Sequence, residues 1–171
     1  MATVTKSHLL PEVEKFLAKD LHSGFVGGKE MGSADGGTFT SFDPGSGKKL
    51  AEVCAFQPSD VAKTIEVANV AFKKQPWAKL PPNERSALLH RLADRVENEK
   101  AILGQIEALD AGKIESQAQG DVQNFVDTMR YFADLAQYTR MQSVLAIKGH
   151  EAWTSRHPWG ACGFIFPWNF P

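Results

Sequence analysis

Apolar residues recur every three or four positions through the middle of the chain, in four stretches between residues 59 and 138. This spacing places side chains along one helix face, so each stretch predicts an amphipathic helix whose apolar face packs into a core. The stripes comprise Val61, Ile65, Ala68 and Phe72; Leu88, Leu89, Leu92 and Val96; Ile102, Leu103, Ile106 and Leu109; and Val122, Phe125, Val126, Met129, Phe132 and Ala136. Residues 9–17 predict a shorter helix. We expect Ser59 to cap the first long helix and Gly112 to end the third.

Strand patterns flank these helices on both sides. Residues 25–29 predict a strand and a glycine turn that opens a hairpin, and further strands are predicted over residues 38–42, 50–56, 144–147, 153–156 and 161–166. Turn-forming residues separate the early strands, and the pair over residues 144–156 predicts a hairpin outside the helical layer. Residues 161–166 are apolar on both faces, which is typical of a central strand in a parallel sheet. The combination favours an α/β fold.

Composition excludes several classes of protein. The chain has 171 residues, 19 basic and 20 acidic, with a formal net charge of −1. It therefore has room for one domain, and no basic surplus that would indicate nucleic-acid binding. The sequence contains no apolar run long enough to span a membrane, and its first residues do not form the apolar core of a signal peptide. Two distant cysteines make no disulfide framework, which favours a cytoplasmic location.

Few residues predict chemistry by spacing alone. The nucleotide-binding glycine motifs, the serine-hydrolase elbow and the metal-binding histidine pairs are absent. Cys162 could be a nucleophile, but its apolar neighbours would raise the pKa of a thiol, so a small buried side chain in a strand is favoured. Cys54 is interpreted in the same way. Asp110 is favoured as a solvated helix-end residue over an oxygen ligand for a hard cation.

The end of the chain carries the strongest chemical signal. Pro167 and Pro171 restrict the backbone on either side of Asn169, at the end of the predicted core strand. A positioned amide N–H can donate to an oxyanion that develops during carbonyl chemistry. Equally, a rigid turn could use Asn169 to cap a following helix, and spacing leaves both readings open. A domain seldom stops at such a strand end, so we expect a piece of a longer protein.

Short motifs recur along the chain in a characteristic order. They are Phe42-Asp-Pro-Gly-Ser-Gly47, Ala71-Phe72 followed by Trp77, Glu84-Arg85, Leu92-Ala-Asp94, Leu109-Asp-Ala-Gly-Lys113, Ser155-Arg-His-Pro-Trp-Gly160 and Pro167-Trp-Asn-Phe-Pro171. Together they resemble the NAD(P)-dependent aldehyde dehydrogenase superfamily, most closely its aldehyde dehydrogenase 1/2-like and betaine-aldehyde branch. The last motif is similar to the family's PWNFP sequence. Trp159 departs from the pattern, because a smaller residue is usual there.

The resemblance implies an α/β fold of the aldehyde dehydrogenase type. Residues 1–141 would form the N-terminal part of a Rossmann-like coenzyme-binding domain. Residues 142–160 would form a protruding oligomerisation hairpin, and residues 161–171 a truncated first core strand. Family members are much longer, and their nucleophilic cysteine and general-base glutamate lie beyond the PWNFP motif. The chain alone is therefore expected to be inactive.

The resemblance also implies roles for individual residues. Asn169 would be the oxyanion donor while an aldehyde is oxidised to a carboxylic acid through a cysteine thiohemiacetal. The coenzyme, NAD or NADP, would lie against Ile165, Phe166, Pro167 and Trp168. A monovalent cation would be bound by Ser41, Phe42 and Asp110. A homodimer or homotetramer is the expected assembly. The alternative is a non-catalytic assembly or binding module derived from the same fold.

Overall fold

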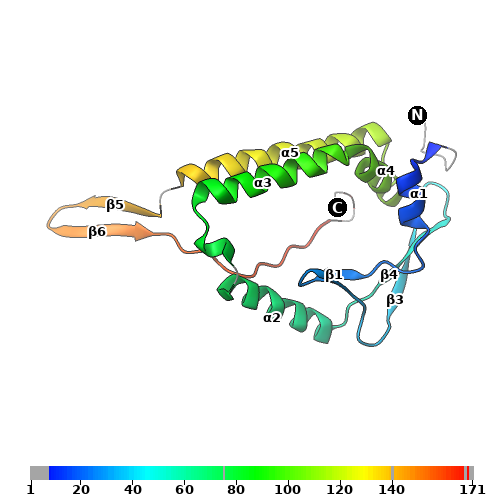
Figure 1. The fold of residues 1–171 in the computed structure, drawn as a ribbon, viewed down its shortest axis with the longest axis horizontal. Helices are drawn as coiled ribbons and strands as arrows, with labels where there is room; N and C mark the ends of the chain where they lie inside the picture. Colours follow the sequence, from blue (N-terminus) through cyan, green and yellow to red (C-terminus); the bar gives the residue numbers. More distant parts are fainter. Residues whose placement is uncertain (1–7, 75, 140, 168, 170–171) are drawn as a thin grey trace.

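The computed structural model describes residues 8–74, 76–139, 141–167 and 169 (Figure 1). Its helices are α1 (Pro11–Leu17), α2 (Pro58–Lys74), the short 3-10 helix η2 (Pro76–Lys79), α3 (Pro82–Asn98), α4 (Lys100–Ala111) and α5 (Glu115–Tyr138). The predicted helices are thus confirmed in number and order. None of the described helices is both long and apolar enough to cross a membrane.

Helices α3, α4 and α5 form a tightly packed layer. α5 lies along α3 and also packs on α4. Small side chains allow this approach: Ala93, Ala118 and Ala133 are fully buried together with Val126. At Gly104 of α4, a Cβ would stand 2.7 Å from Gln119 Cγ, so this crossing requires glycine. The predicted stripes enter this core only in part: Leu109, Val122 and Val126 are buried, whereas Leu92, Phe125 and Phe132 stay largely exposed, and much of the core consists of small residues.

A buried glutamine fastens the N-terminal helix to this layer. Gln105 of α4 is buried, and its Oε1 accepts the N–H of Leu10 at 2.9 Å. Its Nε2 donates to the His8 carbonyl at 3.2 Å and to Glu115 Oε1 at 3.3 Å. Because buried polar groups are costly unless they are paired, this set fixes where the segment before α1 lies.

The helix ends correct one prediction and confirm another. Gly112 follows α4 with a φ of +68°, the left-handed conformation predicted for a helix stop. Ser59 is not the cap of α2, because the helix already begins at Pro58, which suits the first helical position. Instead Asp60 Oδ2 accepts the N–H of Gln57 at 2.9 Å, and its Oδ1 accepts that of Ala34 at 3.2 Å. Asp60 thus fastens a preceding loop to the start of α2.

The strands pair as three separate antiparallel hairpins. They are β1 (Gly24–Val26) with β2 (Lys29–Met31), β3 (Thr38–Phe42) with β4 (Lys49–Cys54), and β5 (Gln142–Ile147) with β6 (His150–Ser155). The first two lie beside α1, and β5–β6 projects beyond the helical layer, as predicted (Figure 1). The strand expected over residues 50–56 ends at Cys54.

The prediction of a core strand over residues 161–166 is wrong for this structure. These residues run as an extended, unpaired segment, and Ile165 is 100% exposed. A strand needs a hydrogen-bonded neighbour, and none of the described residues provides one. Cys162 is exposed for the same reason, so the expectation of a buried thiol there is also wrong. The apolar face of α2, with Val61, Ile65 and Phe72, is likewise left largely exposed.

Candidate functional site

The β3–β4 hairpin is seated on the C-terminal end of α4. A Cβ at Gly112 would stand 2.8 Å from Pro44 Cγ in the hairpin turn. Gly112 also has a φ of +68°, where side-chain-bearing residues are strained. Glycine is therefore required at this position both by the backbone conformation and by the close contact with the turn.

Hydrogen bonds stiffen the turn between β3 and β4. Asp43 accepts the Ser46 hydroxyl at 2.6 Å and the Gly45 N–H at 2.8 Å. The Ser46 hydroxyl is the main reason that the pKa of Asp43 lies below its usual value. Asp43 thus stabilises the turn between the two strands.

Two predicted cation ligands meet at this junction. The Ser41 hydroxyl donates to Asp110 Oδ1 at 2.5 Å, although 69 positions separate them in the sequence. Phe42 follows directly, at an irregularity in the β3–β4 register between Ser41 and Phe42. A hydroxyl, a carboxylate and backbone carbonyls are oxygen donors of the type that hard cations prefer. The donor chemistry therefore fits a cation, and one carboxylate matches a single positive charge.

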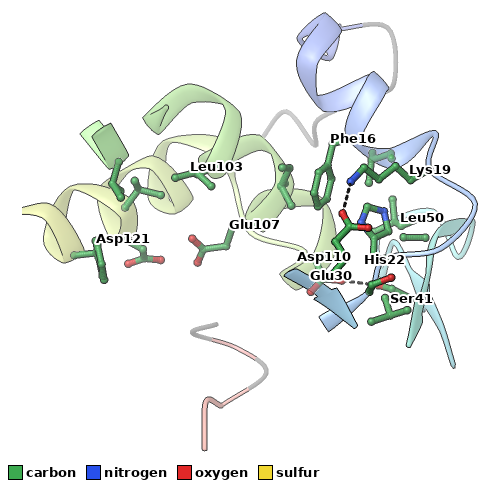
Figure 2. A pocket seen from close by; sticks show the side chains of 18 residues that line it. Phe16, Lys19, His22, Glu30, Ser41, Leu50, Leu103, Glu107, Asp110 and Asp121 are labelled. Atoms are coloured by element: carbon green, nitrogen blue, oxygen red, sulfur yellow. Dashed lines mark hydrogen bonds and ion pairs between the residues drawn. The ribbon is translucent and has the colours of Figure 1, made fainter. Parts of the chain in front are cut away.

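A cavity of about 700 Å³ opens beside this junction (Figure 2). Its apolar wall includes Leu50, Leu103 and Val122, contributed by β4, α4 and α5. The His22 ring packs against Phe16 in a tilted arrangement with centroids 4.4 Å apart. Its Nε2 is buried and has no hydrogen-bond partner among the residues that the structure describes. Sequence reasoning missed this cavity, because its lining comes from segments that are far apart in the chain.

Four carboxylates line the cavity: Glu30, Glu107, Asp110 and Asp121 (Figure 2). The Lys113 ammonium bonds Glu107 Oε1 at 2.5 Å and Asp121 Oδ2 at 2.8 Å. The Lys113 and Glu107 side chains are only 14% and 11% exposed. Burial alone would lower the pKa of Lys113, but its bonds to Asp121 and Glu107 outweigh that effect and raise the pKa. Lys113 ends one of the sequence motifs quoted above, but its contacts with two carboxylates were not predicted.

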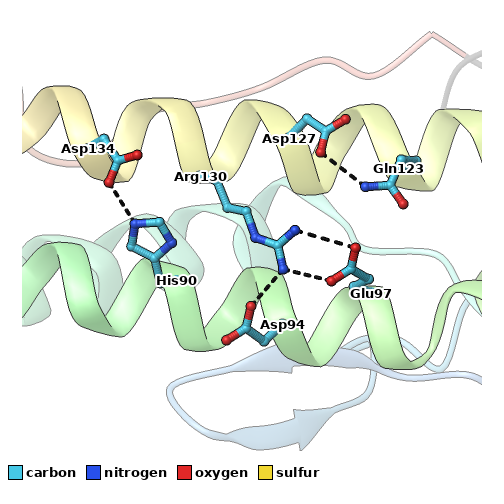
Figure 3. A network of polar contacts seen from close by, with 7 residues as sticks. All are labelled: His90, Asp94, Glu97, Gln123, Asp127, Arg130 and Asp134. Atoms are coloured by element: carbon cyan, nitrogen blue, oxygen red, sulfur yellow. Dashed lines mark hydrogen bonds and ion pairs between the residues drawn. The ribbon is translucent and has the colours of Figure 1, made fainter.

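A second polar network joins α3 to α5 on a more exposed surface (Figure 3). Arg130 donates from Nη2 to Asp94 and to Glu97, at 2.7 Å each. One turn along α5, Asp134 is 2.8 Å from His90 Nε2. The two acceptors hold the pKa of Arg130 above its usual value. The network ties the two helices together, and we assign it no chemistry.

The remaining predicted site residues lie apart from the cavity. Asn169 is exposed in a turn, and Phe166 and Pro167 precede it in the extended segment. The rings of Phe164 and Phe166 stack with centroids 6.3 Å apart. Trp168 lies outside the described residues. The structure thus leaves the segment's apolar side chains exposed and does not bring them to Ser41 and Asp110.

Comparison with known proteins decides the family. The model of the aldehyde dehydrogenase family matches residues 31–171. The chain belongs to the aldehyde dehydrogenase family. The resemblance of the sequence motifs and the predicted α/β fold type are thereby confirmed.

The relatives are about three times longer than the chain. Human retinal dehydrogenase 2 is 32% identical over 172 residues, which cover 99% of this chain and 33% of the relative. The mitochondrial benzaldehyde dehydrogenase of Antirrhinum majus is 35% identical, over 85% of this chain and 28% of its own. The chain therefore spans about a third of the curated relatives it matches.

Solved structures give the same result. A variant of the Bacillus cereus aldehyde dehydrogenase superposes with a TM-score of 0.88 at 34% identity, over 96% of this chain and 33% of its own. The NAD+ complex of a Bacillus cereus aldehyde dehydrogenase gives a TM-score of 0.77 at 32% identity, over 83% of this chain and 29% of its own.

Proposed function

We propose that this chain is the N-terminal third of an enzyme that oxidises an aldehyde to a carboxylic acid with NAD(P)+. The observation that carries the proposal is the superposition of 96% of the chain on one third of a Bacillus cereus aldehyde dehydrogenase. A neighbour solved with NAD+ supports the coenzyme class. The relatives are named for different aldehydes, so the substrate is proposed only as an aldehyde.

In this proposal Asn169 donates its side-chain amide to the substrate oxygen. Attack by a cysteine thiolate places negative charge on that oxygen, and an N–H donor stabilises it more than it stabilises the neutral aldehyde. The exposure of Asn169 supports the role, because its side chain is not enclosed by the chain's own core. When bound, the coenzyme supplies the acceptor for the hydride.

We assign Ile165, Phe166, Pro167 and Trp168 to one wall of the coenzyme cleft. The exposed apolar side chains of residues 164–166 fit this role, since flat coenzyme rings bind against apolar surfaces. The cavity beside Ser41 and Asp110 is not lined by these residues. The segment is therefore proposed as one side of a site that further chain completes.

Ser41, Phe42 and Asp110 are proposed to hold a monovalent cation. The support is the hydroxyl–carboxylate contact and the register irregularity described above. The ion would fix the β3–β4 hairpin against α4 and would take no part in the oxidation.

The projecting hairpin is proposed to join subunits into a homodimer or homotetramer. Val144 and Trp153 face each other across β5–β6 and are 88% and 61% exposed. A lone two-stranded hairpin is marginally stable in water, and Trp is enriched at interface centres. This same surface favours the second candidate, a non-catalytic assembly module.

The protein encoded by the complete reading frame that contains residues 1–171 separates the two candidates. We expect it to bind NAD+ or NADP+ and to reduce the coenzyme in the presence of aldehydes such as benzaldehyde. The 171-residue chain alone should not reduce the coenzyme in the presence of an aldehyde. Assembly into oligomers without coenzyme binding or turnover would overturn the enzyme proposal in favour of the module.

A further inference from the structure

Gly160 is the point at which residues 157–167 pack against the rest of the described chain. It is the one residue in this stretch that is not exposed. A Cβ at Gly160 would stand 3.4 Å from Phe72 Cδ1 and 3.5 Å from Phe72 Cε1, so one edge of the Phe72 ring lies against the glycine. Phe72 belongs to the last turn of α2, which the segment passes after it leaves the β5–β6 hairpin (Figure 1). The contact therefore holds the segment against α2.

The backbone has an unusual conformation at this contact. Gly160 has a φ of +91°, which residues with a side chain rarely adopt. Four positions earlier, the Arg156 N–H donates to the Met141 carbonyl at 2.8 Å and closes the base of the β5–β6 hairpin. Pro158 restricts the backbone between these two points. The path of the chain is thus fixed from the hairpin as far as Gly160.

The direction of the chain beyond Gly160 determines where the proposed oxyanion donor lies. Residues 161–166 are extended and lie in no sheet within the described part of the chain, and Asn169 follows Gly160 by nine positions. Nine extended residues reach up to about 30 Å, so a change of direction of about 5° at Gly160 would displace the far end by about 2–3 Å. A misplacement of about 1 Å can cost about 100-fold in rate. Catalysis by Asn169 is therefore sensitive to the contact at Gly160.

We propose that Phe72 is a positioning residue for Asn169: by packing against Gly160, its ring fixes the direction in which residues 161–169 leave α2. This inference rests on the proposed function, in which Asn169 donates to the substrate oxygen. Phe72 acts through the segment and not on the substrate. A residue that served only the apolar face of α2 would behave like Ile65, which lies seven positions earlier on that face. Ile65 and Phe72 are similarly exposed, at 51% and 40%, so they make a matched pair.

Steady-state kinetics and thermal melts of the protein encoded by the complete reading frame test this role. Phe72→Ala should lower kcat by about tenfold, because the donor is displaced from the reacting oxygen. Phe72→Tyr keeps the ring edge that faces Gly160 and should keep kcat. The control Ile65→Ala should lower the thermal midpoint and leave kcat unchanged. Gly160→Ala should lower kcat as Phe72→Ala does, and the two losses should be less than multiplicative in the double variant, because both act on one contact.

Nuclear magnetic resonance of the 171-residue chain tests the contact by itself. An aromatic ring shifts the resonances of protons that lie against it. The α-proton resonances of Gly160 should therefore move toward random-coil values in Phe72→Ala and should not move in Ile65→Ala.

Each outcome supports or overturns a distinct part of the inference. Phe72→Leu, which stays apolar but lacks the ring, covers the case in which the alanine variant does not fold. A folded Phe72 variant that loses thermal stability but keeps kcat overturns the positioning role while the proposed function stands. Gly160 resonances that Phe72→Ala does not move overturn the contact. An unmodified protein that does not oxidise aldehydes overturns the proposed function, and the positioning role with it.

Discussion

The helical layer and the C-terminal region differ in how far their apolar side chains and strand edges find contacts within this chain. In α3, α4 and α5 a core of mostly small side chains is enclosed, and Val126 has an exposed fraction of 0%, although large side chains such as Phe125 and Phe132 stay about half exposed. In residues 142–167, within the described part of the chain, β5 and β6 pair only with each other, and residues 161–166 lie in no sheet. The first region has its structural role within this chain. The second carries its apolar surface outward, which indicates that its contacts are made with something else.

The largest predicted effect comes from changing Asn169, in the C-terminal region, in the protein encoded by the complete reading frame. The change should affect turnover and not stability. Asn169→Ala should lower kcat by a factor of about 100 to 1000, the usual loss for one oxyanion donor. Coenzyme affinity and the thermal midpoint should change little. Steady-state kinetics and thermal melts of the same preparations measure both.

Asn169→Asp distinguishes the oxyanion donor from a helix cap. A carboxylate repels a developing oxyanion, so turnover should fall at least as far as in the alanine variant. As a cap, aspartate would substitute well, since it accepts the same backbone hydrogen bonds. Near-normal turnover of the Asp variant would rule out the oxyanion role.

Substitutions at the contact between the β3–β4 hairpin and α4 should lower the unfolding free energy of the chain more than any other change considered. Gly112→Val places a side chain at positive φ and against Pro44, and we expect a loss of about 2–4 kcal/mol in unfolding free energy. Gly120→Ala is the control: Gly120 lies within α5, where a Cβ would meet nothing within 4 Å. It should stabilise the chain by about 0.5–1 kcal/mol. Urea unfolding measures both, and equal effects would contradict the close contact.

Truncating one valine in each region tests the comparison directly. Val126→Ala removes a fully buried side chain from α5 and should cost about 2 kcal/mol. Val144→Ala, on the exposed hairpin, should change the stability of the chain by less than about 0.5 kcal/mol. A Val144 effect as large as that of Val126 would show that the hairpin packs against the chain's own core.

The smallest effect concerns Asp60 at the start of α2, whose carboxylate accepts the N–H groups of Gln57 and Ala34. The N–H of Gln57 is the main reason that the pKa of Asp60 lies below its usual value. A depressed folded-state pKa adds stability at neutral pH, which is lost as the pH falls through that pKa. Asp60→Asn should therefore be less stable at pH 7 and lose less stability between about pH 4 and pH 2. Parallel pH profiles for the two proteins would contradict this.

Sequence patterns predicted the elements that are determined locally. Helical spacing and the turn chemistry of Asp43 and Gly112 act within a few residues, so the helices and hairpins were found in order. Ser59 was misplaced as a cap because Pro58 and Asp60 on either side of it already start the helix. The strand at residues 161–166 failed because strand formation depends on a neighbour, which local pattern cannot supply.

The candidate site shows the same division. Ser41 and Asp110 were paired by resemblance to a family, and the structure places them in contact. Spacing alone favoured a solvated Asp110 at a helix end, and Asp110 is indeed exposed; its contact with Ser41, 69 positions away, could not be predicted from spacing. Lys113, His22 and the cavity depend on several elements meeting in space, which no local pattern reports. The role of Asn169 stays a prediction from the resemblance.

Amide hydrogen exchange tests the central claim most directly, namely that the small-residue core of the helical layer forms within this chain while residues 142–167 are completed by further contacts. In the 171-residue chain, the interiors of α3, α4 and α5 should be protected, and residues 161–167 should exchange at nearly unprotected rates. In the protein of the complete reading frame, residues 161–167 should become as protected as α5. Equal and fast exchange of that segment in both proteins, or strong protection in the 171-residue chain, would contradict the account.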